Sequence, residues 1–398
     1  MTLKQINYSF YIFLFVYFLI LAFSSTSLSL SIKEITIFYD NEHSLLWYLT
    51  HISTHFFGTT NFGIRIPFVL FYVLSVLIAY WLSEDYFTKP IDRLISIIIF
   101  MLLPGLNSAA LLVDTAIVVI FCTLLYLYLF KLYGKEYYVL LVLFLFIDNS
   151  FAILFLALFF YSLQKKDNVL LIISLVLFGL SMQIYGFDLG GHPKSYFLQT
   201  FASYASIFSP IIFLYFFYTL YRISIKGQKD LYWYISFTSL ILSLVFSLRQ
   251  RVDIADFAPY LVIAVPLMVK TFLHSYRVRL KEFRYKHKVF ANIMLLTLLI
   301  NTTILLFNKP IYLFLNDPKD HFAYRFHIVN DLAKQLKLLG IKKVYCEDRK
   351  LQKKLDYYGV TNSNVNILLD TKVPTYHKKI EIKYGNKIIK TYYLLLQK

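Results

Sequence analysis

Long apolar runs alternate with short polar breaks along most of this chain. A helix needs about twenty mostly apolar residues to cross the hydrocarbon core of a bilayer. Several of the runs are shorter than this, and the two on either side of Asp148–Ser150 are close enough to form one tight hairpin. The pattern predicts a polytopic all-α membrane protein with about eleven transmembrane helices. The runs lie at 8–30, 64–83, 93–108, 111–130, 137–148, 150–163, 168–186, 207–223, 231–248, 257–275 and 288–307.

From Asn308 onward the chain becomes polar and rich in lysine. The spacing of apolar positions there predicts helices over 321–339 and 349–358, and strands over 343–346, 365–369, 379–383 and 387–396. The last two strands flank Tyr384-Gly385-Asn386, which favours a hairpin turn. We therefore predict a transmembrane domain over 1–307 and a small α/β domain over 308–398. The tail contains no G-x-G-x-x-G or P-loop motif, so no nucleotide is predicted.

The composition excludes several classes of protein. Of the 398 residues, 58% are hydrophobic, 19% aromatic and only 16% charged. Soluble domains have roughly 45–50% apolar and about 25% charged residues. A soluble globular enzyme, a disordered chain and a disulfide-stapled module are therefore excluded. The two cysteines, Cys122 and Cys346, carry little information on redox compartment.

The net charge of +17 follows the predicted topology. Alternate loops carry most of the cations, and by the positive-inside rule these loops face the cytoplasm. The N-terminus is then cytoplasmic, and an odd number of spans places the C-terminus outside a cell inner (cytoplasmic) membrane. The first apolar run is long and no A-x-A site follows it, so we expect an uncleaved span and not a signal peptide. Because topology accounts for the charge, no nucleic-acid partner is predicted. The opposite loops hold only Lys33, Arg65, Lys194, Arg249 and Arg251.

The first outer loop is the richest candidate for chemistry. The predicted spans hold almost no ionisable residues at mid-depth, which argues against a pathway through the bilayer. Ser44–Phe57 has the spacing of an interfacial helix, and Asp40 lies just before it at headgroup depth, where a general base for a lipid-linked substrate would be needed. Alternatively, Asp40 or Asn41 caps that helix and Glu42 lies in its first turn. The residues expected to face lipid are Leu45, Leu46, Leu49, Ile52 and Phe56.

Because cations are scarce in the loops predicted to lie outside, each of them suggests a negatively charged ligand. Arg65, Lys194, Arg249 and Arg251 could bind a phosphate, for which arginine supplies bidentate hydrogen bonds; alternatively, they snorkel to lipid headgroups. Asp114, at the outer start of the fourth span, could face Asp40, or it is simply placed favourably at a helix N-terminus.

Histidines offer little sign of a metal site. His51 and His55 are four residues apart, but no third ligand can be identified by spacing. An interfacial histidine pair is the favoured interpretation, and the metal ligands are unknown.

Four stretches, in this order, resemble the membrane glycosyltransferases that use polyprenyl-phosphate sugars. This C-type fold family includes the protein O-mannosyltransferases and the aminoarabinose transferase of lipid A. The resemblance covers most of residues 8–307 and is strongest over 35–130. The matching stretches are Phe38–His43, then Phe57-Gly58 with Phe62–Pro67, then Leu103-Pro104 with Asp114-Thr115, and Ala258–Tyr260 with Pro266.

The resemblance implies roles for individual residues. Asp40 would be the base that activates the acceptor, Glu42 its neighbouring acid, Asp114 a second acid near the site, and Arg65 would lie beside the donor phosphate. Because Asn41 separates Asp40 from Glu42, the sequence leaves open which of the two matches the family's base. Some family members use a divalent metal and others do not, so a divalent metal cofactor stays open.

The resulting hypothesis is inverting transfer of a sugar from a polyprenyl-phosphate donor to a lipid, glycan or protein acceptor at the outer membrane face. The roles of Lys194, Arg249 and Arg251 rest on charge placement alone. Two other classes stay open: a non-enzymatic lipid or polysaccharide exporter, which needs polar mid-span faces, and an assembly factor whose tail binds a partner protein.

Overall fold

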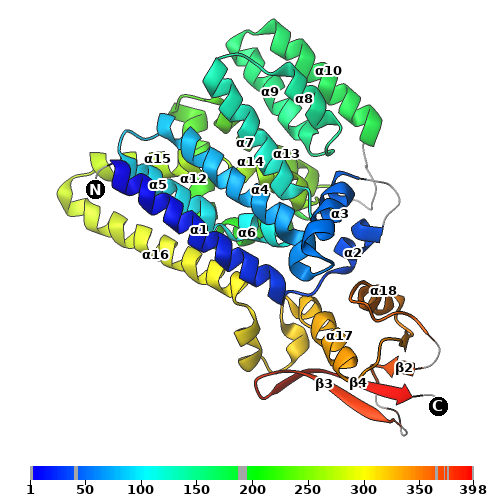
Figure 1. The fold of residues 1–398 in the computed structure, drawn as a ribbon. Helices are drawn as coiled ribbons and strands as arrows, with labels where there is room; N and C mark the ends of the chain where they lie inside the picture. Colours follow the sequence, from blue (N-terminus) through cyan, green and yellow to red (C-terminus); the bar gives the residue numbers. More distant parts are fainter. Residues whose placement is uncertain are drawn as a thin grey trace. The chain divides into compact units, whose positions relative to one another are not determined.

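The computed structural model describes residues 3–39, 44–186, 195–363, 366–371, 373 and 376–396 (Figure 1). Its internal contacts divide the chain into two compact units. The first unit comprises Met1–Phe18, Leu70–Ala110 and Asp114–Thr302. The second unit comprises Leu19–Val69, Leu111–Val113 and Thr303–Lys398. The first outer loop therefore groups with the C-terminal tail, while the predicted domain boundary at 307/308 stays a prediction.

Helices make up the described part of the first unit. α1 (Leu3–Ser27), α4 (Asn61–Leu82) and α16 (Lys281–Leu306) each continue into the second unit. A short 3₁₀ turn, η1, covers Ser83–Asp85. The remaining helices are α5 (Pro90–Leu102), α6 (Pro104–Leu111), α7 (Ala116–Tyr133), α8 (Tyr138–Leu145), α9 (Phe151–Lys165), α10 (Asn168–Tyr185), α11 (Phe197–Phe208), α12 (Pro210–Lys226), α13 (Leu231–Ser247), α14 (Ile254–Val262) and α15 (Val265–Val278).

Among the described residues, five helices are long and apolar enough to cross a membrane, or up to eight if each bent pair is one span. The bent pairs are α5–α6, α11–α12 and α14–α15, with angles of 54°, 106° and 44°. This is the helix content of a polytopic membrane protein. All eleven predicted apolar runs lie on helices, but α9 and α13 are shorter and α8 has only 8 residues. The number of spans stays a prediction.

Proline explains where the three pairs bend. Pro104 and Pro210 are the first residues of α6 and α12, and Pro266 is the second residue of α15. Proline has no N–H to donate and disfavours helical geometry in the residue before it, so a helix ends there and a new one begins.

Hydroxyl groups join α13 to its neighbours inside the first unit. Ser236 Oγ donates to the carbonyl of Tyr260 at 2.7 Å, and Ser239 Oγ donates to that of Phe257 at 2.8 Å. The buried Tyr260 hydroxyl then donates to the carbonyl of Ser150 at 2.9 Å. Small serines allow close helix approach, and their hydrogen bonds hold helices together where hydrophobic driving force is weak. These contacts fix α14 with respect to α13, and the N-terminal end of α9 with respect to α14.

The second unit contains a four-stranded sheet with order β1-β2-β4-β3 (Figure 1). β1 (Tyr345–Cys346) pairs parallel with β2 (Asn366–Leu369), while β4 (Lys387–Leu396) pairs antiparallel with β2 and with β3 (Lys378–Tyr384). Its helices are α2 (Ile32–Tyr39), α3 (Leu45–Phe57), α17 (Val329–Leu338) and α18 (Arg349–Tyr357), with 3₁₀ turns η2 (Lys309–Leu313), η3 (Pro318–Asp320) and η4 (Tyr324–Phe326).

Local patterning in the tail is largely confirmed. The predicted hairpin is present, and Gly385 adopts a φ of 56° that suits glycine at its turn. The helix predicted from residue 321 begins only at Val329. The His321 ring explains the delay, because its Nδ1 accepts from Ala323 N at 3.0 Å and its Nε2 lies 2.9 Å from the Asn308 carbonyl. These contacts favour turns over a continuous helix.

Candidate functional site

A buried ion pair organises the first outer loop. Arg65 Nε lies 2.9 Å from Glu34 Oε1, and Arg65 Nη2 lies 3.0 Å from Oε2, with both side chains almost fully buried. The guanidinium also donates to the carbonyls of Ser25, Leu28 and Ser29 at 2.6–3.2 Å. Arginine has five N–H donors, so all are used within the second unit. The geometry supports a role for Arg65 in holding the loop; its contact with phosphate stays a prediction.

Glu34 joins three segments of the second unit. It forms a reciprocal capping pair with Ser31 at the start of α2: Ser31 N donates to Glu34 Oε2 at 2.7 Å, and Glu34 N donates to Ser31 Oγ at 3.2 Å. Val113 N also donates to Glu34 Oε1 at 3.3 Å. α2 ends at Tyr39, the residue before Asp40 in the sequence, and Val113 precedes Asp114. Neither α2 nor a role for Glu34 was predicted, because this segment was expected to be loop.

The helix predicted over Ser44–Phe57 is present as α3 (Leu45–Phe57), and its interfacial location stays a prediction. Ser44 is its N-cap, with Oγ accepting from Trp47 N at 3.3 Å, so α3 does not take Asp40 or Asn41 as its cap. Ile52 and Phe56 are 59% and 76% exposed, as expected for a lipid-facing side, whereas Leu46 is buried. Leu46 was expected in lipid; it lies on the opposite side of the helix, which packs inward.

His51 is held by aromatic rings. It stacks between Phe38 and Trp47, at centroid distances of 4.3 and 4.0 Å, and its Nδ1 lies 3.0 Å from the Trp47 carbonyl. In the described part of the chain, no three His, Cys, Asp or Glu side chains gather as a metal site would require.

α18 of the tail packs against this loop. Tyr357 meets Phe38 edge-to-face at 5.3 Å. The Tyr358 hydroxyl donates to Asn61 Oδ1 at 2.5 Å and accepts from Leu30 N at 2.9 Å. Burial raises the pKa of Tyr358 to about 12, so it stays a neutral donor at physiological pH. The tail therefore supports the helix that precedes Asp40 in the sequence.

Three predicted site residues lie outside the described part of the chain. These are Asp40 and Glu42 in the stretch 40–43, and Lys194 in the stretch 187–194.

The other predicted residues lie in the first unit. Asp114 is half-buried just before α7, and its Oδ1 accepts from Ala116 N at 3.3 Å, which suits a carboxylate at a helix N-terminus. Arg249 and Arg251 are both exposed in the turn between α13 and α14. Arg251 lines two adjoining cavities of the first unit.

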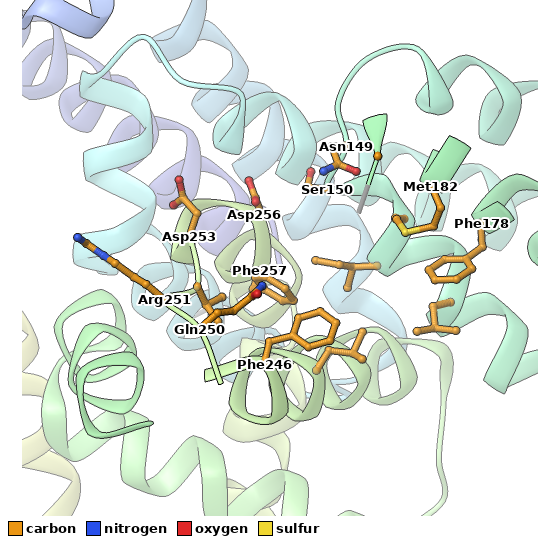
Figure 2. A pocket seen from close by; sticks show the side chains of 16 residues that line it. Asn149, Ser150, Phe178, Met182, Phe246, Gln250, Arg251, Asp253, Asp256 and Phe257 are labelled. Atoms are coloured by element: carbon orange, nitrogen blue, oxygen red, sulfur yellow. The ribbon is translucent and has the colours of Figure 1, made fainter. Parts of the chain in front are cut away.

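The first cavity is amphipathic, with a volume of about 360 Å³. Its apolar wall includes Phe178 and Met182 of α10, and Figure 2 shows Arg251 extending away from these two side chains. The other polar lining residues are Asn149, Ser150, Gln250, Asp253 and Asp256. A second cavity of about 450 Å³ shares Arg251, Val252 and Asp253 with the first and is lined by Tyr196, Gln199, Thr200 and Ser203 as well. The pair forms a pocket with one apolar end and one polar end.

Two features of this pocket bear on ligand binding. Ser150 Oγ is buried and, among the described residues, has no hydrogen-bond partner. Asp253 Oδ1 accepts from Ala255 N at 3.0 Å and so caps α14. Ser150, Asp253 and Asp256 were not among the predicted site residues. The two aspartates could have been found from the sequence, because they form a D-x-x-D pattern close to Arg251 in the short polar segment between two apolar runs.

Comparisons with known proteins add one finding. No family model and no curated protein sequence matches the chain. Among solved structures, the chain is similar to the crystal structure of ArnT from Cupriavidus metallidurans in the apo state, with 12% sequence identity and a TM-score of 0.47. The match covers 88% of this chain and 73% of that chain. A likeness this distant assigns neither a family nor an activity to the chain.

Proposed function

We propose that this chain is a membrane glycosyltransferase. It moves a sugar from a polyprenyl-phosphate donor to a lipid, glycan or protein acceptor at the outer face of the cytoplasmic membrane. The observation that carries the proposal is the amphipathic cavity at Arg251, combined with the resemblance in the sequence. A polyprenyl-phosphate sugar has an apolar tail and an anionic head, and the cavity offers an environment for each.

The polar end of the cavity suits a sugar phosphate. Arg251 supplies a guanidinium, which binds phosphate oxygens with two parallel hydrogen bonds. Asp253 and Asp256 have carboxylate oxygens that accept from sugar hydroxyls. The hydroxyl of Ser150, which has no hydrogen-bond partner in the described part of the chain, is available to a ligand as well. By the predicted orientation, this end of the helices faces outward.

The reaction is a displacement at the anomeric carbon of the donor sugar. In our proposal Asp40, or Glu42 in its place, accepts the proton of the acceptor hydroxyl as that oxygen attacks. The bond between the anomeric carbon and the phosphate oxygen breaks, and the phosphate leaves with the bonding electrons. Arg251, with Arg249 and Lys194, stabilises the charge on the leaving phosphate. Asp114 is the second carboxylate of the site.

Arg65 has a positioning role in this proposal. Its bonds to Glu34 and to three carbonyls hold α2, the helix that ends one residue before Asp40. A base must be held in place to be effective, and this buried bidentate pair restricts the motion of α2, which precedes the proposed base in the sequence. If the chain were an exporter or an assembly factor, Arg65 would hold the same loop but would position no catalytic base.

The test is turnover of purified full-length protein with a panel of labelled polyprenyl-phosphate sugars, followed by release of the carrier. We expect carrier release with at least one donor and its loss in Asp40→Asn or Glu42→Gln, whichever removes the base. Asp320→Asn, an exposed residue of the tail, is the matched control and should keep activity. Absence of turnover across the panel would overturn the proposal, and so would full activity in both acid variants.

A further inference from the structure

A third cavity lies at the opposite ends of the first-unit helices. It has a volume of about 640 Å³ and shares no lining residue with the two outer cavities. Its lining comes from the segment before and at the start of α5, the end of α12, the segment between α12 and α13, and α15. By the predicted orientation these ends face the cytoplasm.

Basic side chains line this cavity in two helical rows. α12 presents Arg222 and Lys226, one turn apart, and α15 presents Lys270, His274 and Arg277 over two turns. Residues at these spacings share a helix face. The positive-inside rule accounts for cations in the cytoplasmic loops. Here, in addition, cations from two helices that pack together line a single cavity.

The two carboxylates of the cavity are already engaged. Asp92 Oδ2 lies 2.5 Å from Arg277 Nη2. Asp230 accepts from the Tyr86 hydroxyl at 2.5 Å and from Trp233 N at 2.9 Å, as the N-cap of α13. The lining has four Lys and Arg side chains, Arg222, Lys226, Lys270 and Arg277, against these two carboxylates, so positive charge is in excess.

Three cations remain beside the Arg277–Asp92 pair: Arg222, Lys226 and Lys270. None of them forms a salt bridge with another described residue. Lys270 Nζ lies 5.2 Å from the centre of the Tyr86 ring, which holds it beside the cavity. Like charges one turn apart destabilise a helix, so this arrangement has a cost that a bound anion would relieve.

We propose that this cavity binds a phosphate-bearing anion at the cytoplasmic face. The shared chemistry is a phosphate group held by Arg222, Lys226 and Lys270, and its source is an anionic phospholipid headgroup or a soluble phosphate. Basic pockets between membrane helices on the cytoplasmic side are suited to such headgroups. The inference goes beyond the proposed sugar transfer and does not depend on it.

The experiment measures binding to purified full-length protein in a neutral detergent. The ligands are short-chain phosphatidylglycerol, phosphatidylcholine of the same chain length, and inorganic phosphate, and the readout is the rise in melting temperature along each titration. A basic residue near an anionic group contributes roughly a fivefold gain in affinity, so the triple variant Arg222→Gln, Lys226→Gln, Lys270→Gln should bind about 100-fold more weakly.

A matched control removes the same charge elsewhere. The triple variant Lys281→Gln, Lys286→Gln, Lys288→Gln lies on the exposed start of α16, on the same predicted side, and should bind as the unmodified protein does. If the cavity triple does not fold, Lys270→Gln alone should weaken binding about fivefold. A response to phosphatidylglycerol alone identifies a lipid headgroup, and a response to inorganic phosphate identifies a soluble anion. Equal binding by the cavity variant and the unmodified protein would overturn the proposal, as would equal losses in both triples or no response to any phosphate.

Discussion

Arg65 and Glu34 form a bidentate ion pair inside the second unit, with Nε–Oε1 and Nη2–Oε2 distances of 2.9 and 3.0 Å. They are 31 residues apart in the sequence. Arg65 opens the second apolar run, and Glu34 caps a helix of the first outer loop. The pair therefore links the start of a membrane helix to the loop that carries the proposed base.

Breaking this pair should destabilise the protein strongly. Glu34→Gln leaves the guanidinium buried without its counter-charge, and removing one partner of a buried pair costs about 3–5 kcal/mol. We expect a lower melting temperature for Glu34→Gln and for Arg65→Met. The double variant should be less destabilised than the sum of the two, because neither charge is then left alone. Additive losses would show that the two residues act independently.

Tyr358→Phe should loosen the contact between α18 and the first outer loop. The variant leaves Asn61 Oδ1 and Leu30 N without their hydroxyl partner, and an unsatisfied buried group costs about 1–3 kcal/mol. Limited proteolysis and the melting temperature would measure the loss. Tyr345→Phe, on the more exposed strand β1, should have a small effect. Similar behaviour of the two variants would argue against the contact.

Stability of the tail should fall in mild acid because of His327. Burial, with smaller contributions from His321 and Lys309, lowers the pKa of His327 to about 3. An unfolded histidine takes up its proton below about pH 6.5, so between these values the unfolded state binds more protons and is favoured. We expect full stability above about pH 6.5 and a loss of up to about 1.4 kcal/mol per pH unit below it.

His327→Phe provides the comparison for this effect. Phenylalanine keeps an aromatic ring beside Tyr312 but has no group that titrates. Melting temperatures measured from pH 7.5 to pH 5 should decline less steeply for this variant than for the unmodified chain. Parallel curves would assign the acid sensitivity to other groups.

Arg251→Gln should weaken donor binding while leaving the fold intact, since Arg251 is exposed at the cavity. Loss of a charge-assisted bond to phosphate costs roughly 1.5–3 kcal/mol, which corresponds to about a 10- to 150-fold fall in kcat/KM. Arg249→Gln, two residues earlier and outside the lining of both cavities, should lower kcat/KM by less. Lys281→Gln, on the exposed start of α16, is the control for the loss of a charge and should leave kcat/KM unchanged. Equal kcat/KM for Arg251→Gln and the unmodified enzyme would remove Arg251 from the site.

Features that depend on local pattern could be predicted from the amino-acid sequence. Eleven apolar runs coincide with helices, Ser44–Phe57 with a capped helix, and the turn at Gly385 with a hairpin. Each of these features depends on hydrogen bonds between residues close in the sequence and on which side of the helix or strand is apolar. Asp40, Glu42, Asp114 and Lys194 also came from the sequence, and their roles stay proposals.

Contacts between side chains far apart in the sequence became visible only in the folded chain. Nothing in the sequence around Glu34 indicates its partners, and the fold brings it to Arg65 and Val113. Ser150, Met182 and Arg251 lie on separate helices and turns, yet line one cavity. Arg222 lies at the end of one predicted apolar run and Lys270 lies inside another, and only the packing of their helices places both around one cavity. Such pairings depend on how whole helices pack, and no periodicity within a short window carries that information.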